Sequence, residues 1–437
     1  MTSAADPSAS ALSGRRLLVV LGSYRSKKHI YERARDLGVR LVVVDGPDHW
    51  VRDAPEIFER HLPVALDPFD TFAARAIAAI RDAGLAFDGI GTIDEFAGSF
   101  AAAIATGLKL PFHSQRAVDV ARDKHRVREV CAASGLAGPR FARIEGLADV
   151  EAALAAVPLP AVLKPVRGVG SVQACRVTDA TGLERHAGGI LASASASRAL
   201  TGGRRGSDRD WFDLMWSGPA ALILESWLEG PKFDVDLVLH GGEAVYGRVT
   251  DDLQPFGLRD VQRIAPSDLA AGDEGALVDH AARCVRAIGF MDGVFNVEVK
   301  LTEDGPITVE VNGRLGGYST VDIHREVWGV DLVEQWLRLC LGLFPRIEPR
   351  EPQSFVAESL LPAPASGRLQ RDGFLDALAG DPSLLACRQW VFAGEGVEGQ
   401  ETGAPDWLGA VLARAPSRRE ALNELERLVA KVRPVIE

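Results

Sequence analysis

The chain has 437 residues, of which 47% are apolar and 25% charged, as is typical of a soluble globular protein with two or three domains. Its formal net charge of −11 argues against a nucleic-acid backbone as the main partner, although local cations and a metal ion can still hold a nucleotide. The five cysteines are scattered, which favours reduced thiols over a disulfide framework or a zinc site: Cys131, Cys175, Cys284, Cys340 and Cys387.

Targeting and membrane signals are not evident in the sequence. Residues 1–14 are small and polar and lack the apolar centre of a signal peptide, so we expect a disordered tail there. The longest weakly polar run, residues 96–108, is too short to cross a bilayer. We therefore expect a cytoplasmic protein without a membrane partner.

Residues 16–45 form the first predicted unit, a strand, a helix and a second strand. An apolar run at 16–22 ends in glycine, a helical stretch covers 28–37, and 40–45 is again apolar. This order is typical of a β-α-β unit in a parallel sheet. The Gly22-Ser23-Tyr24 sequence could hold a phosphate, but without a G-x-G-x-x-G pattern it indicates a dinucleotide site only weakly.

Asp94 and Glu95 follow a further short strand, predicted at residues 89–93. Ligands of open α/β sheets gather at the carboxyl ends of the strands, so both acids are candidates for substrate contact. An acid pair at the start of a helix, where the helix dipole favours negative charge, explains them at least as well. The first domain is expected to end near residue 112.

Lys164 interrupts an apolar strand predicted at residues 161–165, where a lysine is costly unless it meets an anion. The glycine loop Gly168-Val169-Gly170-Ser171 follows directly, and its backbone N–H groups could surround phosphates. Lysine is scarce in this chain, so positions that kept it are candidates for a compact point charge: Lys27, Lys28, Lys109, Lys124, Lys164, Lys232, Lys300 and Lys431. A coding bias towards arginine explains the scarcity equally well.

A hairpin predicted at residues 295–312 is the strongest pattern in the chain. Two alternating segments, 295–301 and 307–312, flank a Glu-Asp-Gly-Pro turn. Such a hairpin sets Glu298, Glu310 and Asn312 close together on one side of the sheet. Two carboxylates and an amide oxygen suit Mg²⁺ or Mn²⁺ rather than Zn²⁺.

The hairpin ends abruptly in Arg314 and a glycine pair, Gly316-Gly317, whose bare backbone lets an anion approach closely. A surface hairpin with polar residues facing water would explain the alternating glutamates. It explains the Asn-Gly-Arg-Leu-Gly-Gly ending less well, so the residues favour a site.

Five motifs, taken in order, resemble the ATP-grasp superfamily of carboxylate–amine ligases over about residues 16–342. They are Asp123-Lys124, AVLKP with its glycine loop, ILESWLEGPKFDVDLVL, NVEVK and VEVNGRLGG. Residues 225–252 and the later LLPAPASGRL are most similar to the branch of L-amino acid ligases and carnosine-synthase-type enzymes. The resemblance implies an α/β fold with an N-terminal open parallel domain, a small lid and a mixed-sheet ATP-grasp body.

The resemblance also implies domain boundaries. After the tail at 1–14, an N-terminal domain covers 15–112 and an ATP-grasp domain covers 113–345, with its lid at about 138–228. Residues 346–437 form a C-terminal segment that packs on the ATP-grasp body. ATP is expected to lie between the sheets of the lid and the body.

Residue roles follow from the same resemblance. Lys124 and Lys164 are expected to hold ATP phosphates, and the loop with Gly168, Gly170 and Ser171 to fold over the β- and γ-phosphates. Lys164 is also expected to be catalytic, because it cancels charge while two anions meet.

The adenine is expected beside a hinge strand that contains Glu225, Trp227 and Leu228 and offers backbone groups to the base. One or two Mg²⁺ (or Mn²⁺) ions are expected on Glu298, Glu310 and Asn312.

Arg314 is expected to be catalytic and to lie against the transferred phosphate, with Gly316 and Gly317 near the substrate carboxylate. The sequence departs from the family at Lys232. The family often has an acid at this position, which accepts hydrogen bonds from the ribose hydroxyls, and lysine cannot replace it because lysine has no acceptor. Asp234 and Asp236 are nearby alternatives for holding the ribose.

Three further residues are candidates for lining the pocket: Arg263, His324 and Trp328. A structural role is the more ordinary explanation of each.

The leading hypothesis is an ATP-dependent ligase that activates an amino acid carboxylate as an acyl phosphate and joins it to an amine. A carboxylase or purine-biosynthesis-type ATP-grasp enzyme is the alternative, and a catalytically weak nucleotide-binding protein, which Lys232 would support, is a third. The expected partners are small-molecule carboxylates and amines, without nucleic acid, and a homodimer is left open.

Overall fold

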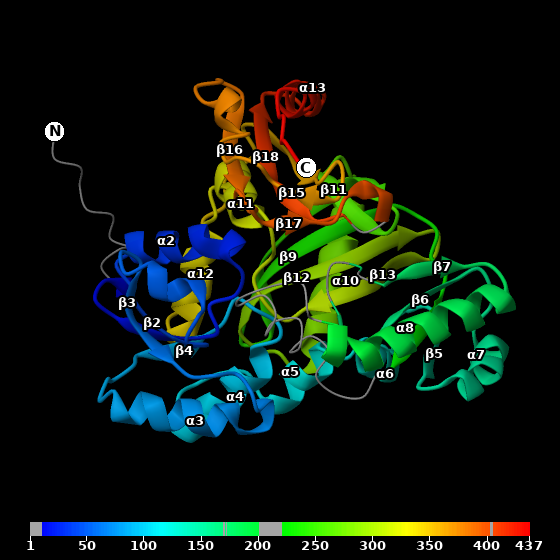
Figure 1. Ribbon diagram of the computed structural model, residues 1–437, viewed down its shortest axis with the longest axis horizontal. Helices are drawn as coiled ribbons and strands as arrows, with labels where there is room; N and C mark the ends of the chain where they lie inside the picture. Colours follow the sequence, from blue (N-terminus) through cyan, green and yellow to red (C-terminus); the bar gives the residue numbers. More distant parts are fainter. Residues whose placement is uncertain (1–10, 169–170, 172, 201–220, 403–404) are drawn as a thin grey trace.

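Four short strands form a parallel sheet at the N-terminal end of the chain, in the order β3-β2-β1-β4 (Figure 1). The computed structural model describes all residues except 1–10, 169–170, 172, 201–220 and 403–404. The strands are β1 (Arg16–Val20), β2 (Arg40–Asp45), β3 (Phe58–Pro63) and β4 (Gly89–Gly91). The predicted β-α-β unit is confirmed, because β1 and β2 pair in parallel around the intervening helix.

Apolar layers cover both faces of this parallel sheet, which is why its strands are continuous apolar runs. Helix α2 (Lys28–Asp36) packs on one face, and α3 (Phe69–Asp82) with α4 (Gly98–Leu108) packs on the other. Two short 3-10 turns complete the domain: η1 (Arg25–Lys27) and η2 (Trp50–Asp53).

The segment predicted to form a lid contains a second sheet, antiparallel, in the order β5-β8-β6-β7. Its strands are β5 (Phe141–Ile144), β6 (Ala161–Pro165), β7 (Cys175–Val177) and β8 (Leu222–Ser226). One apolar cluster joins this sheet to α7 (Val150–Ala156) and α8 (Ala180–Leu200), which follow η3 (Leu147–Asp149). Helices α5 (Gln115–Ala121) and α6 (Lys124–Ala133) connect the lid to the N-terminal domain.

A large antiparallel sheet forms the centre of the molecule, in the order β13-β12-β9-β10-β11-β14-β18-β16. Its first five strands are β9 (Lys232–His240), β10 (Glu243–Phe256), β11 (Arg259–Ala265), β12 (Gly293–Thr302) and β13 (Gly305–Asn312). Helix α10 (Ala271–Ile288) packs on one face, since Leu277, Ala281 and Val285 are fully buried against β-strand residues. The predicted hairpin is confirmed, with Glu298 opposite Glu310 and Asn296 opposite Asn312.

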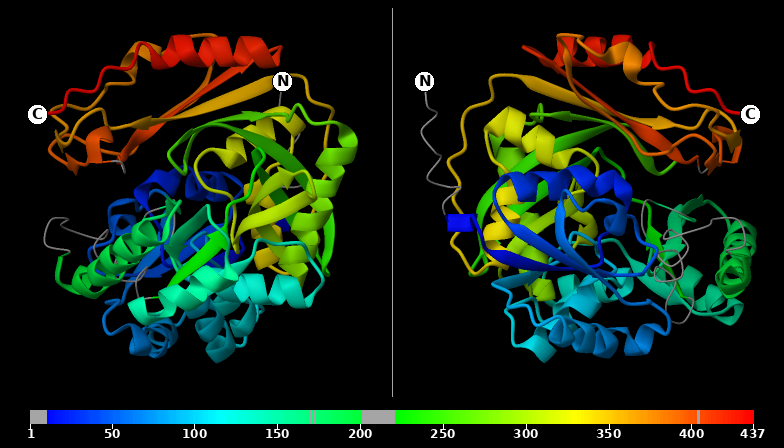
Figure 2. Two further views of the ribbon diagram at one scale, coloured as in Figure 1. Left: turned by 90° about the vertical axis from the view of Figure 1, so that its right-hand side faces the viewer. Right: turned by 60° about the vertical axis from the view of Figure 1, so that its left-hand side comes forward.

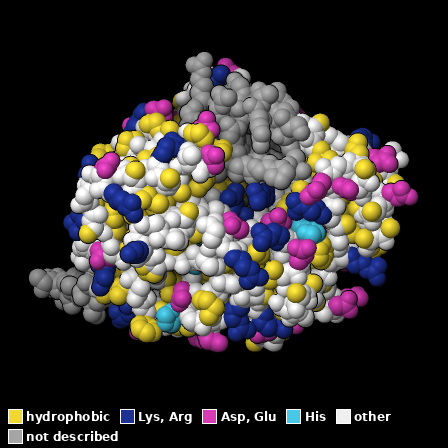
Figure 3. Space-filling model, turned by 90° about the horizontal axis from the view of Figure 1, so that it is seen from below, with side chains coloured by type: hydrophobic (Ala, Val, Ile, Leu, Met, Phe, Trp, Pro, Cys, Tyr) yellow, Lys and Arg dark blue, Asp and Glu magenta, His cyan; other side chains and the backbone are white. Residues whose placement is uncertain are grey.

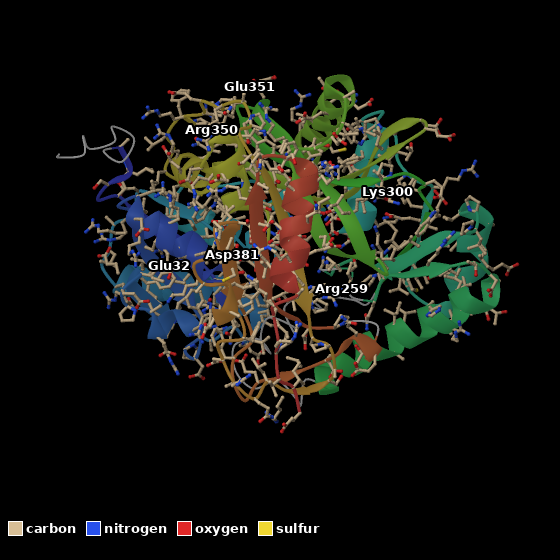
Figure 4. The ribbon with its side chains drawn as sticks, turned by 90° about the horizontal axis from the view of Figure 1, so that it is seen from above. Glu32, Arg259, Lys300, Arg350, Glu351 and Asp381 are labelled. Atoms are coloured by element: carbon tan, nitrogen blue, oxygen red, sulfur yellow. The ribbon has the colours of Figure 1, made fainter. Side chains whose placement is uncertain are left out.

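The C-terminal segment supplies the remaining three strands of that sheet, β14, β18 and β16. It contains β14 (Phe355–Pro362), β16 (Leu384–Gln389), β18 (Trp407–Ala415) and α13 (Arg418–Val429), with the short β15 (Gly367–Arg368) and β17 (Gly396–Val397) and the turns η4 (Asp376–Leu378) and η5 (Gln400–Thr402). Figure 2 shows α13 lying across the outer face of these strands. Asp381, labelled beside α13 in Figure 4, is paired with Arg427 and Lys431.

Two further helices fasten the N-terminal domain to the central body. They are α11 (Thr320–Trp328) and α12 (Leu332–Cys340), and their apolar side chains share one core with α2 and β1. The contact is close because Gly89 and Gly91 have no side chain: a Cβ on Gly89 would lie 2.0 Å from the Cys340 carbonyl oxygen. This packing brings the loop after β4 towards the end of β13.

The predicted tail at residues 1–14 needs one correction. Residues 1–10 lie outside the described residues, but Leu12 is completely buried in the core of the N-terminal domain. Burial in the core orders Leu12, because removing its apolar side chain from water is favourable. Its small and polar neighbours in the sequence give no sign of this burial. Among the helices of the described residues, none has both the length and the apolar character that crossing a bilayer requires.

Candidate active site

A pocket between the lid and the central sheet gathers most of the predicted site residues. Those that line it are Lys124, Lys164, Gly168, Ser171, Glu225, Trp227, Leu228, Glu298 and Glu310. Gly170 lies outside the described residues. Asn312 ends β13, and Arg314, Gly316 and Gly317 follow it; these four residues are not among the lining residues.

Lys164 is held in the pocket by a buried acid on the neighbouring lid strand. Its Nζ lies 2.8 Å from Oε2 of Glu225, and Arg128 Nε lies 2.7 Å from the other oxygen of that carboxylate. Burial alone would raise the pKa of Glu225, but Arg128 and Lys164 hold it at about 2. Burial lowers the pKa of Lys164, and Glu225 offsets only part of that effect. The anion that a lysine in this apolar strand requires is the Glu225 carboxylate in this structure, and the role of Lys164 towards phosphate stays a prediction.

Lys124 approaches the same pocket from the first turn of α6. The side chain of Asp123 accepts a hydrogen bond from Arg126 N and so fixes the start of the helix. Lys124 Nζ lies 2.8 Å from Glu310 Oε1 and donates to the Gly168 carbonyl oxygen at 2.9 Å. The lysine therefore links the hairpin to the residue that opens the glycine loop.

Glu298 and Glu310 face one another across β12 and β13, and each has a lysine partner. Lys232 Nζ lies 3.0 Å from Glu298 and 3.1 Å from Asp252. Burial raises the pKa of Glu298, and the neighbouring Glu310 adds to the rise against the effect of Lys232. Burial would also raise the pKa of Glu310, but Lys124 holds it below its usual value.

The chemistry of this acid pair fits a hard divalent cation, because positive charge between two partly buried carboxylates relieves their repulsion. The amide of Asn312 fits less directly. Its oxygen accepts from Arg314 at 3.1 Å, while its nitrogen donates to Asn296. Within the described ranges, no group of three or more His, Cys, Asp or Glu side chains is placed to hold a metal ion. A metal here would use the two glutamates, with Asn312 only after its oxygen leaves Arg314.

Arg314 has neutral partners, the carbonyl oxygen of Leu315 at 2.9 Å and the Asn312 oxygen. Its positive charge reaches both Glu310 in the pocket and Lys27 in the N-terminal domain. Gly316 has no space for a side chain, because a Cβ there would lie 2.7 Å from Asp236 Oδ1. The segment after β13 thus runs close to the body, and the charge of Arg314 acts on groups in both the pocket and the N-terminal domain.

The predicted adenine hinge presents an aromatic ring with two cations nearby. Arg176 lies 4.3 Å and Lys300 lies 5.2 Å from the centre of the Trp227 ring. Lys300, labelled in Figure 4 on the lid side of the central sheet, also donates to the Leu228 carbonyl oxygen at 2.8 Å. The backbone N–H of Trp227 already donates to Pro160, so that group is not available to a base in this arrangement. Glu225 was predicted to offer its backbone, but its side chain also takes part, in a triad with Lys164 and Arg128.

A second polar cluster lies where the N-terminal domain meets the body. Asp94 accepts hydrogen bonds from Ser23 Oγ at 2.7 Å and from Phe96 N at 2.9 Å, as a structural turn would. Within the described residues, Glu95 Oε2 and two nitrogens of Arg122 are buried without a hydrogen-bond partner. Burial, together with the charge of Glu310, raises the pKa of Glu95 to about 7. Unsatisfied buried groups of opposite charge are typical of a place where a ligand belongs.

Three residues considered for the pocket are instead parts of the core. Trp328 is buried among apolar side chains, His324 bonds Asp236 and Tyr246, and Arg263 is paired with Asp234 and Glu358. Because Asp234 and Asp236 are engaged in this way and do not line the pocket, neither holds the ribose in this arrangement.

Several site residues were not predicted from the sequence. Arg128 could have been found, since it lies four residues after Lys124 and therefore on the same helix face. Lys232 was noted only as a departure from the family, and Lys300 only as a retained lysine, because their partners come from other strands. Figure 3 views the molecule from below, and near the centre of this lower face cationic and acidic side chains are interleaved.

Comparisons with known proteins agree with this geometry. Two family models match, the ATP-grasp domain over residues 157–322 and the ATP-grasp N-terminal domain over residues 31–112. Human carnosine synthase 1 is 33% identical over 351 residues, covering 78% of this chain and 41% of that protein. Alanine–anticapsin ligase of Bacillus subtilis strain 168 is 24% identical over 244 residues, covering 52% of this chain and 48% of that protein.

Among solved structures, the crystal structure of L-amino acid ligase from Bacillus licheniformis has a TM-score of 0.81 at 22% identity, covering 97% of this chain and 99% of that one. The chain belongs to the ATP-grasp superfamily, as its motifs predicted, and the mixed α/β ATP-grasp fold is confirmed. Within that superfamily its relatives include carnosine synthases and an alanine–anticapsin ligase, and the chain spans about two fifths of the length of the carnosine synthases it matches.

Proposed function

We propose that this chain is an ADP-forming carbon–nitrogen ligase that activates a carboxylate as an acyl phosphate and joins it to an amine. The observation that carries the proposal is the pairing of two lysines, the partly buried Lys124 and the buried Lys164, with acids inside one pocket between lid and sheet. Membership of a superfamily of ATP-binding domains supports ATP as the phosphoryl donor. The named activities of the similar ligases support the carbon–nitrogen bond as the product.

The phosphates of ATP would take the place of the acids as partners of the two lysines. Lys124 would exchange Glu310 for a phosphate oxygen, and Lys164 would keep Glu225 while its remaining N–H groups face the pocket. Gly168 and Ser171 line the pocket at the same end, which supports a phosphate-covering role for their loop. The Trp227 ring would stack on the base.

A divalent ion, when bound to Glu298 and Glu310, supplies charge neutralisation for the β- and γ-phosphates. Release of Glu310 from Lys124 would make this carboxylate available to the ion at the moment when the lysine turns to phosphate. Lys232, which has no acceptor, would stay on Glu298 and Asp252, and the ribose would be held by other groups.

The reaction would then proceed in two displacements. A carboxylate oxygen attacks the γ-phosphorus, an O–P bond forms, and the bond to the ADP oxygen breaks. The amine nitrogen attacks the acyl carbon, the C–N bond forms, and inorganic phosphate leaves while the amine loses a proton. Arg314 would stabilise the negative charge of the transferred group from the body side.

An amino acid as the acid component is supported by the charges at the junction with the N-terminal domain. Arg314 and Lys27 provide positive charge there, and Glu95 provides a buried carboxylate oxygen without a hydrogen-bond partner among the described residues. This combination complements a molecule that has both a carboxylate and an ammonium group.

Product analysis tests the proposal. The chain is incubated with ATP, Mg²⁺ and a panel of amino acids as acids and amines, and nucleotides and amides are identified by chromatography and mass spectrometry. We expect ADP, phosphate and an amide in equal amounts, and only slow ADP release when the amine is omitted. AMP as the nucleotide product would overturn the acyl-phosphate route. ADP formation that depends on bicarbonate, with no amide from any pair, would favour the carboxylase alternative.

A further inference from the structure

Lys27 is a cation that the N-terminal domain presents to the body, and no described acid pairs with it directly. It ends the 3-10 turn η1, and its Nζ donates to the Ile93 carbonyl oxygen at 2.8 Å in a partly buried position. Within the described ranges, no carboxylate lies within ion-pair distance of this amine. Burial and the charge of Arg314 lower the pKa of Lys27 to about 8.

Arg314 is in the same situation on the opposite side of the junction. Its guanidinium bonds two neutral oxygens, those of Leu315 and Asn312, and has no acid within ion-pair distance in the described part of the chain. Lys27 bonds the carbonyl oxygen of Ile93, Arg314 bonds that of Leu315, and Ile93 and Leu315 belong to one apolar cluster, so two cations from different domains lie at one junction. The positive charge of Arg314 disfavours the charged form of Lys27. Such an arrangement is costly in the protein alone and becomes favourable when an anion lies between them.

The acids nearest to this pair do not supply that anion. Asp94 already accepts from Ser23 and Phe96, and Glu95 lies in the junction with one oxygen unpartnered among the described residues. Both influence Lys27 through space, but neither is paired with it. One N–H of the Lys27 ammonium is used on Ile93, so two further donors are available to a ligand.

We infer that Lys27, together with Arg314, binds the carboxylate of the acid substrate and presents it to the phosphoryl donor, so that the N-terminal domain determines specificity for the acid. This inference rests on the proposed function, because it assigns the substrate of the same site. It adds a residue that lies outside the nucleotide pocket and in a different domain from the predicted catalytic groups. The acid is then held by one cation from each side of the junction.

Acid activation can be measured with hydroxylamine as the amine, because a trapped acyl phosphate appears as a hydroxamate. The test compares the wild type with Lys27→Gln, which keeps an N–H donor for Ile93 and removes the charge, and with Lys27→Arg. Lys28→Gln is the matched control, since Lys28 is the adjacent lysine and pairs with Glu32 and Glu56. Each of the twenty common amino acids is supplied in turn with ATP and Mg²⁺.

We expect the KM for each activated amino acid to rise about tenfold or more in Lys27→Gln, as loss of a charge-assisted hydrogen bond requires, with KM for ATP unchanged. Lys27→Arg should recover most of the affinity, and Lys28→Gln should match the wild type. Equal KM values for the acid in wild type and Lys27→Gln would overturn the inference while leaving the ligase proposal intact.

A binding measurement separates failure of the inference from failure of the proposed function. Carbon-13 acetate is titrated in the presence of Mg-ADP and followed by NMR. Saturable binding is expected in the wild type and Lys28→Gln, with at least about tenfold weaker binding in Lys27→Gln. If no amino acid forms a hydroxamate but acetate binding depends on Lys27, the ligase proposal fails and the carboxylate site stands. Acetate binding that is absent, or equal in the wild type and Lys27→Gln, overturns the site.

Discussion

Lys164 Nζ lies 2.8 Å from Glu225 Oε2, so a cation on strand β6 of the lid is fixed by an acid on the neighbouring strand β8. Arg128 of α6 takes the other oxygen of the same carboxylate and also donates to the Val309 carbonyl oxygen at 2.6 Å. The lid, the connecting helix and the hairpin thus meet at one buried carboxylate. The position of Lys164 in the pocket depends on this Glu225 carboxylate.

Glu225→Gln should destabilise the protein by roughly 3–5 kcal/mol, because it leaves two buried cations without their anion. Urea unfolding followed by tryptophan fluorescence measures the change. Glu229→Gln is the matched control, since Glu229 is exposed four residues later and should change stability little. Equal stability of the wild type and Glu225→Gln would mean that the triad is not a source of stability.

The same carboxylate should make stability depend on pH in the acid range. Its pKa falls from a usual 4.5 to about 2 in the folded protein, so its contribution is complete above pH 4.5 and is lost as pH falls towards 2. The difference in unfolding free energy between wild type and Glu225→Gln should therefore shrink over this window. Unfolding curves at several pH values test this, and a difference that stays constant down to pH 2 would contradict it.

Glu310→Gln should reduce turnover by about a hundredfold or more, since a charge that supports the transition state is lost while side-chain size is kept. Turnover is measured at saturating Mg²⁺ and ATP. Glu303→Gln serves as the control, because Glu303 is exposed in the turn of the same hairpin. Near-normal turnover of Glu310→Gln would remove the metal assignment.

Lys164→Ala should weaken ATP binding by roughly 1.5–3 kcal/mol, the contribution of a hydrogen bond to a charged group. Calorimetry with Mg-ATP gives this value directly. Lys431→Ala, at the exposed end of the chain beside Asp381, should bind ATP as the wild type does. Unchanged affinity in Lys164→Ala would leave that lysine with a structural role only.

Lys232→Met should lower the Mg²⁺ concentration needed for half-maximal activity, because Lys232 now neutralises Glu298 at 3.0 Å. A unit charge a few ångströms away is worth a few kcal/mol at an effective dielectric constant near 20, and about 1.4 kcal/mol corresponds to a factor of ten, so a shift of at least roughly tenfold is expected. Activity titrations with Mg²⁺ measure it. A higher Mg²⁺ requirement in the variant would show that the lysine supports the site in another way.

The hairpin and Lys164 could be predicted from the sequence because their signals are local. Alternation and a turn specify which residues of β12 and β13 face one another, and a lysine in an apolar strand is conspicuous. The partners of Glu298 could not be predicted, because Lys232 and Asp252 reach it only through the order of strands β12, β9 and β10. Asn312 was predicted to be a metal ligand from its spacing in the hairpin. The orientation of its amide, however, depends on its hydrogen bonds with Arg314 and Asn296.

The pairing of β11 with β14 has a consequence for any shortened form of this protein. Residues 262–265 of β11 pair with residues 356–359 of β14, so the C-terminal segment protects a strand of the central sheet. A chain cut before β14 would expose the backbone N–H and C=O groups of β11 along an open edge, which is a template for strand addition by another molecule. Proteolysis between residues 345 and 354 should therefore yield insoluble fibrous material rather than a working fragment.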